Sequence, residues 1–142
     1  MSKTKVNPYL AFKGNCKEAM EFYKSALGGE LELMDFGGAP MDVPEDYKSK
    51  ILHSKLEFGE AIIMASDTMP GTEINFGDNV SIAIAAESEE IGQNYFNNLS
   101  ADGKVLMPFA DAFWGSKFGM LEDKFGVRWM VDCSKAEFVS EK

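Results

Sequence analysis

The sequence predicts an α+β protein in which one βαβββ unit occurs twice along the chain. Two observations predict this fold. Strand-like and helix-like segments follow one another in the same order in both halves, and a segment rich in Gly, Pro and Asp separates the halves. We expect a single domain over residues 1–142, with module one at about 5–67, a linker at about 68–78 and module two at about 79–133.

The first half begins with a strand at residues 6–12, where side chains alternate and β-forming residues dominate. Asn15 stands three residues before Glu18, which is the spacing of a helix-capping start. Apolar residues then recur at helical intervals until Gly28 and Gly29, which end the helix. Three further strands are expected at residues 30–36, 50–58 and 60–66.

The second half repeats this order, with a strand expected at residues 79–85 and a helix that starts at Ser88 and has acidic residues in its first turn. The apolar face of this helix is predicted to hold Ile91, Tyr95 and Leu99. A short strand at residues 104–108 and a hairpin at residues 114–131 complete the unit. The segment at residues 113–130 holds both tryptophans, which is more aromatic surface than an exposed hairpin usually carries.

Composition excludes several classes of partner. The chain has 23 acidic and 14 basic side chains and a net charge of −9, so neither nucleic acid nor an anionic membrane surface is expected to bind it. No apolar run has the ~20 residues of a membrane span, and the first six residues lack the apolar core of a secretory signal. Cys16 and Cys133 are expected to be reduced thiols in a cytoplasmic protein.

Five segments of the chain together resemble the PhnB-like family of the vicinal oxygen chelate superfamily, which includes glyoxalases and bleomycin-resistance proteins. They are residues 8–15, 18–23, 53–56 and 64–67 and the hairpin that starts at Trp114. The resemblance implies a glyoxalase/bleomycin-resistance-like domain whose two βαβββ modules form curved mixed sheets around a cleft, with helices on the outer faces. It also implies a homodimer. Some members are labelled 3-demethylubiquinone 3-methyltransferase.

The superfamily holds a divalent metal ion with His, Gln or Glu at four strand positions. The resemblance places these positions here on Asn7, Met64, Asn79 or Ser81, and Met130. Amides, a hydroxyl and thioethers are poor ligands for Mg²⁺, Mn²⁺ or Zn²⁺, which bind carboxylate or imidazole. We therefore expect no metal ion, and no other cofactor is predicted.

His53 is the only histidine and the best candidate for a catalytic group, although no catalytic residue is assigned. Strict alternation puts Leu52, Leu56 and Phe58 on one face of their strand, and Ile51, His53, Lys55 and Glu57 on the other. His53 is then either a ligand contact or general base in the cleft, or a structural histidine. The cleft is expected to bind its ligand through Tyr9, His53, Lys55, Met64, Ser81, Trp114 and Met130.

These observations predict a metal-independent small-molecule-binding protein whose ligand is not identified. An aromatic or anionic metabolite suits the expected cleft better than a cation. The alternative is an enzyme of the same superfamily, either a lyase or isomerase with His53 as the base or a metal-dependent enzyme. The methyltransferase label gains no support, because residues 13–16 hold one glycine where a glycine-rich turn is needed. Arg128 could bind a carboxylate or phosphonate, or it could pair with a surface acid.

Overall fold

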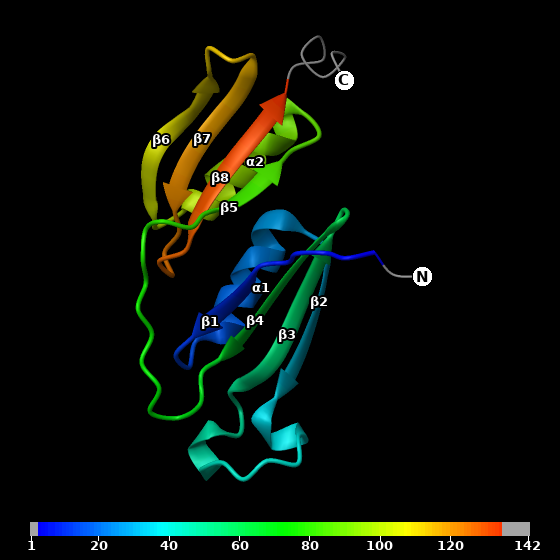
Figure 1. Ribbon diagram of the computed structural model, residues 1–142, viewed down its shortest axis with the longest axis vertical. Coiled ribbons are helices and arrows are strands. Elements are labelled where there is room, and N and C mark those ends of the chain that lie inside the picture. Colours follow the sequence, from blue (N-terminus) through cyan, green and yellow to red (C-terminus); the bar gives the residue numbers. More distant parts are fainter. Residues whose placement is uncertain (1–2, 135–142) are drawn as a thin grey trace. The chain divides into compact units, whose positions relative to one another are not determined.

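A computed structural model describes residues 3–134, and the chain divides into two compact units, Met1–Asn75 and Phe76–Lys142. Each unit is a four-stranded mixed sheet with one α-helix, and each is described by itself (Figure 1). Neither helix in the described part of the chain is long and apolar enough to cross a bilayer.

The first unit has the element order βαβββ, with two short 3₁₀ turns at Phe36–Gly38 and Glu45–Tyr47 between its second and third strands. Its α-helix and strands are β1 (Tyr9–Phe12), α1 (Cys16–Leu27), β2 (Glu30–Asp35), β3 (Ile51–Phe58) and β4 (Ala61–Asp67). The strands lie in the order β1-β4-β3-β2, where β1 runs parallel to β4 and the other pairs are antiparallel.

The second unit repeats this topology, and the predicted α+β fold with two βαβββ units is confirmed. Its elements are β5 (Ile82–Ala85), α2 (Glu89–Ser100), β6 (Lys104–Asp111), β7 (Ser116–Glu122) and β8 (Arg128–Ser134). The strand order is β5-β8-β7-β6, and again only the first pair is parallel.

Three strand boundaries differ from the predicted ones because pairing partners set them. β1 begins at Tyr9 rather than at residue 6; Pro8, just before it, has no N–H to donate to a ladder. β5 begins at Ile82 rather than at residue 79, since its partner β8 starts only at Arg128 after a tight turn. β6 continues past Pro108, because irregularities on either side of Met107 accommodate the proline.

The core of the first unit lies between α1 and its sheet. The helix buries one apolar stripe, made of Cys16, Ala19, Met20, Tyr23, Ala26 and Leu27. The sheet contributes Phe12, Leu56, Ile63 and Ala65, all buried. Asn15 precedes the helix as predicted, but its side chain makes no capping hydrogen bond. The amide of Cys16 bonds instead to the carboxylate of Asp67, 51 residues further along the chain.

In the second unit, the face that α2 packs on the sheet overlaps only in part with the predicted apolar face. Leu99 is buried as predicted, together with Gly92 and Phe96, whereas Ile91 and Tyr95 are half-buried. Phe96 stacks on Phe109 of β6, with ring centroids 5.8 Å apart. Gly92 leaves room for the Phe109 ring, because a Cβ there would lie 2.9 Å from it. The predicted helix start is correct, since the Ser88 hydroxyl accepts a hydrogen bond from the amide of Ile91.

A bulge in β3 overturns the strict alternation predicted for that strand. Met34 pairs with His53 and Asp35 pairs with Ile51, so Leu52 is the extra residue. Ile51 is therefore buried and lines a recess together with Asn15 at the start of α1. It does not share a face with His53, and the prediction that it does was wrong. The positions from His53 onward keep the alternation, with Ser54 and Leu56 buried.

Candidate functional site

The face of the first sheet opposite α1 brings four of the predicted site residues together. Tyr9 of β1 pairs with Met64 of β4, which pairs in turn with Lys55 of β3. Their strand neighbours Leu56, Ile63 and Ala65 are buried, so alternation places these side chains on the opposite face. His53 lies two residues from Lys55 on the same strand and therefore on the same face.

Tyr9 and His53 interact directly across this face. The Tyr9 hydroxyl lies 3.3 Å from His53 Nδ1, and the two ring centroids are 5.9 Å apart at an interplanar angle of 35°. Tyr9 is 51% exposed and His53 is half-buried. Either the phenol donates to Nδ1, which leaves a proton on Nε2, or Nδ1–H donates to the phenol oxygen. Both arrangements fix the two rings and leave polar atoms available to a ligand.

Lys55 shares this face with two carboxylates, Glu57 on its own strand and Glu32, its partner on β2. The Nζ of Lys55 lies 3.8 Å from Glu57 Oε2, and both of these side chains are partly exposed. A pair this long at a partly exposed position contributes little to stability, so Glu57 holds the ammonium group weakly. A ligand carrying negative charge can therefore compete for Lys55.

Two residues of β2, Glu32 and Met34, lie on this face although they were not predicted to do so. Met34 on β2 pairs with His53 and is 51% exposed, next to the predicted position of the ligand. Alternation in the second predicted strand could have indicated its direction. Its alignment with His53 depends on the bulge that follows it, which no sequence pattern revealed.

The other predicted site residues belong to the second unit. Met130 of β8 pairs with Ala83 and with Met120, and Ser81 directly precedes β5. Trp114 lies between β6 and β7, 42% exposed, with its ring edge-on to Phe118 at a centroid distance of 5.5 Å. The predicted site residues thus form two groups, one in each unit.

The residues at the superfamily's metal positions do not fit a hard divalent ion. Met64 and Met130 each stand in the middle of a strand and offer only a thioether sulfur. Within residues 3–134, no group of three or more His, Cys, Asp or Glu side chains is placed to hold a metal ion. Amide and thioether donors suit soft ions better than Mg²⁺, Mn²⁺ or Zn²⁺.

Asp67 and Asp123 are buried carboxylates of the kind that often mark an active site, but both bind the protein's own N–H groups. Asp67 accepts hydrogen bonds from the amides of Gly14 and Cys16 through Oδ1 and from Ile51 through Oδ2. Asp123 accepts hydrogen bonds from two amides of its own turn and from Trp129 Nε1. These contacts assign both carboxylates a structural role.

Cys16 is not poised to act as a nucleophile. Burial raises the pKa of its thiol to about 12, an effect opposed in part by a hydrogen bond with Ser54 and reinforced by the charge of Asp67. The Sγ and Oγ atoms are 3.7 Å apart. The reactive form of cysteine is the thiolate, so this thiol stays protonated and inert at neutral pH.

Solved structures with the same fold define the class of protein. The chain matches protein PA1353 from Pseudomonas aeruginosa at 41% identity and a TM-score of 0.84, over 93% of this chain and 98% of the other. A glyoxalase/bleomycin resistance protein/dioxygenase from Nocardioides shares the fold at 16% identity, with a TM-score of 0.57 over 96% and 87% of the two chains. The fold is thus that of the glyoxalase/bleomycin-resistance superfamily.

Sequence comparison shows the family to which the chain belongs. A family model described as 3-demethylubiquinone-9 3-methyltransferase matches residues 4–132, and the chain belongs to this family. Protein YjdN of Escherichia coli (strain K12) is 32% identical over 143 residues, which is 93% of this chain and 97% of that protein. A putative 3-demethylubiquinone-9 3-methyltransferase, PhnB protein, from Bacillus cereus is 26% identical, with a TM-score of 0.72 over 92% and 100% of the chains.

Proposed function

We propose that this protein binds a small organic molecule without a metal ion, and that the sheet face opposite α1 receives the ligand. The observation that carries the proposal is the contact between Tyr9 and His53 at 3.3 Å on a face that also holds Lys55 and Met64. A flat aromatic ring, a thioether and a few hydrogen-bonding groups are the usual lining of a small-molecule site.

The Tyr9 ring favours an aromatic ligand, and Lys55 can receive one negative charge in competition with Glu57 on its own strand and Glu32, its partner on β2. Lys55 supplies a permanent positive charge, and His53 can add a second one on protonation. The Tyr9 ring offers a stacking surface, while its hydroxyl and the His53 imidazole offer a donor and an acceptor. A planar metabolite that carries a carboxylate or an enolate would use all of these groups.

The metal-dependent alternative gains little support from the ligand chemistry. The fosfomycin resistance protein FosX from Listeria monocytogenes, whose structure contains Mn(II) and a dihydroxypropylphosphonic acid, shares the fold at 12% identity and a TM-score of 0.67. At that identity the likeness concerns the fold alone. Met64 and Met130 of the present chain bring no oxygen or imidazole ligand for such an ion.

The family name would suggest methyl transfer. The connection between β1 and α1 does not favour this activity. S-adenosylmethionine is commonly bound at a glycine-rich turn whose amides face the cofactor. Here the amides of Gly14 and Cys16 at that turn are already bound to Asp67. We therefore propose binding rather than methyl transfer.

A second candidate function is proton-transfer catalysis, as in a lyase or isomerase, with His53 as the general base. The contact with Tyr9 favours it, because a phenol can orient the imidazole or relay its proton. In this candidate, Lys55 would stabilise the negative charge that develops on the substrate.

Replacing His53 separates the two candidates. A thermal-shift screen of planar aromatic acids identifies a ligand, and its Kd is then measured for the wild-type protein and for His53→Ala. For a binding protein we expect His53→Ala to weaken binding by about tenfold or less, the size of one lost hydrogen bond. Tyr9→Phe is the matched control, because it keeps the ring and removes only the hydroxyl.

For an enzyme, the outcome of the same substitution would be different. His53→Ala would abolish turnover of the identified compound by a factor of ~100 or more, as expected when a general base is removed. If His53→Ala, Tyr9→Phe and the wild-type protein all bind the ligand equally, the ligand lies elsewhere and the proposed site is wrong.

We also propose that the protein forms a homodimer. β6 is an edge strand, and its residues Val105, Leu106 and Met107 are between 41% and 52% exposed. An exposed apolar edge strand usually pairs with another chain or is covered by one. Light scattering at micromolar concentration is expected to give twice the 15.7 kDa mass of the chain. A species of 15.7 kDa alone would contradict the proposal.

A cytoplasmic location fits the state of the two cysteines. Both are free and buried, and Cys16 lies in the first unit while Cys133 lies in the second. Reduced thiols of this kind are typical of cytoplasmic proteins.

A further inference from the structure

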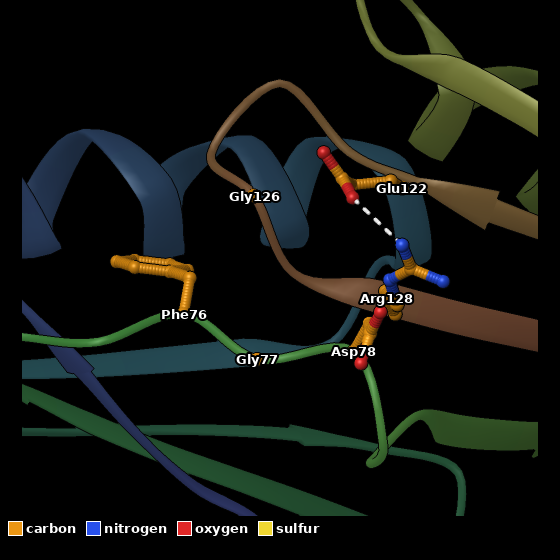
Figure 2. A pocket seen from close by; sticks show the side chains of 6 residues that line it. All are labelled: Phe76, Gly77, Asp78, Glu122, Gly126 and Arg128. Carbon is orange, nitrogen blue, oxygen red and sulfur yellow. Dashed lines mark ion pairs between the residues drawn. The ribbon is translucent and has the colours of Figure 1, made fainter.

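The second unit contains a recess that the proposed function does not use. It is lined by Phe76, Gly77, Asp78, Glu122, Gly126 and Arg128. Figure 2 shows Arg128 projecting from β8, with Glu122 at the end of β7 on one side and Asp78 of the preceding connection on the other. The Phe76 ring lies beside the turn that holds Gly126.

The guanidinium group of Arg128 is incompletely bonded. Its Nη2 lies 3.5 Å from Glu122 Oε1, which is longer than the ~2.8 Å of a charge-assisted hydrogen bond. Its Nε is buried and has no hydrogen-bond partner within the described residues. The side chain is only 26% exposed, so water solvates it poorly. Buried donors without partners are rare in folded proteins, so the protein itself satisfies this guanidinium group incompletely.

The backbone keeps the recess open next to an aromatic ring. Gly126 has a positive φ of 91°, and a Cβ at this position would lie 3.1 Å from Phe76 Cδ2. The absence of a side chain therefore lets the ring of Phe76 lie against the turn. Phe76 is nevertheless 54% exposed, which leaves part of its surface available for stacking.

We infer that this recess binds a monoanionic carboxylate attached to a planar organic group. The carboxylate would bind the Nη donors of Arg128, whose planar fork matches the two oxygens of a carboxylate, and the planar group would lie against Phe76. Asp78 and Glu122 repel anions, so a dianionic phosphate or phosphonate is disfavoured relative to a singly charged carboxylate. Every residue of this site is in the second unit, so the inference does not rest on the proposed function.

Benzoate is a suitable probe, with amide chemical shifts of the full-length protein as the readout. Titration is expected to shift the amide signals of Gly77 and Gly126 with a saturable dependence on benzoate. Arg128→Gln is expected to weaken this binding by about tenfold, because a charge-assisted hydrogen bond is lost. Lys124→Gln also removes one positive charge, from the neighbouring turn, and is expected to leave the affinity for benzoate unchanged.

Glu122→Gln gives the sharpest test, because the two roles of Arg128 predict opposite effects on benzoate binding. If Glu122 only holds Arg128 in place, its loss weakens binding, whereas in an anion site its loss strengthens binding. With the competing carboxylate removed, benzoate is expected to bind several-fold more tightly. Weaker binding in Glu122→Gln, equal binding in Arg128→Gln, or no saturable shift at Gly77 and Gly126 would each overturn the inference. Inorganic phosphate that shifts the same signals at lower concentration than benzoate would overturn the choice of a carboxylate. Circular dichroism of each variant confirms that it is folded.

Discussion

Replacing Asp67 with alanine is expected to lower the free energy of unfolding of the first unit by about 4 kcal/mol. Three amides lose their acceptor, and each unsatisfied buried donor costs about 1–3 kcal/mol. Asp67 is only 4% exposed, so water cannot easily replace the carboxylate. The three amides belong to the start of α1 and to β3, and their loss would loosen the attachment of the helix to the sheet.

The thiol of Cys16 provides the measurement. It is fully buried at the start of α1 and reacts with an alkylating reagent only when this region opens. Its alkylation rate at increasing urea, followed by mass spectrometry, gives the stability of the first unit. Asp67→Asn keeps one acceptor oxygen and is expected to lose about 2 kcal/mol.

Asp35→Ala is the matched control for Asp67. Asp35 also accepts an amide hydrogen bond, from Gly38, but at an exposed position. We expect Asp35→Ala to lower the free energy of unfolding by less than about 1 kcal/mol, as for an exposed helix cap. Equal losses in Asp67→Ala and Asp35→Ala would show that burial of the acceptor does not set its contribution.

The second large effect is expected for Asp123→Ala, which should lower the free energy of unfolding of the second unit by about 3 kcal/mol. Asp123 is 3% exposed and holds the turn between β7 and β8 through the amides of Phe125 and Val127, at 2.8 and 3.0 Å. It also accepts from the indole of Trp129 at 2.8 Å, which fixes the largest side chain of the core.

Tryptophan fluorescence measures this effect selectively, because both tryptophans, Trp114 and Trp129, lie in the second unit. Asp78→Ala removes the same charge from an exposed position and is expected to change stability by less than about 0.5 kcal/mol. A urea midpoint for Asp123→Ala equal to that of the wild-type protein would contradict the role assigned to this carboxylate.

The fold was predictable because each unit is built from local patterns. Alternation and helical spacing identified the strands and the two α-helices found in residues 3–134, and their repeated order gave the βαβββ topology. Boundaries depended on long-range pairing, as β5 shows: residues 79–81 have strand character but precede the first residue that pairs with β8. The residue that caps α1 could not be predicted from local sequence either, because Asp67 is 51 residues away from Cys16 along the chain.

The site was predictable only where alternation survives. Alternation placed Tyr9, His53 and Lys55 on the cleft side and the resemblance placed Met64 there, and the register of β1, β4 and β3 brings the four residues onto one face. It failed at Ile51, because the bulge after Met34 shifts the register by one residue. Arg128 had two open interpretations, and the structure shows its pairing with Glu122 at 3.5 Å. Anion binding remains the inference made above, from the length of this ion pair and from the buried Nε, which has no partner among residues 3–134.

Metal content measured together with ligand binding tests the central claim most directly. The purified full-length protein is dialysed without chelator, its metals are quantified by mass spectrometry, and the thermal shift caused by a bound aromatic acid is measured with and without EDTA. We predict far less than one equivalent of any transition metal and a ligand-induced rise in Tm that EDTA leaves unchanged. One equivalent of Mn, Ni, Zn or Fe that survives dialysis, or a rise in Tm that EDTA abolishes, would contradict a metal-independent binding protein.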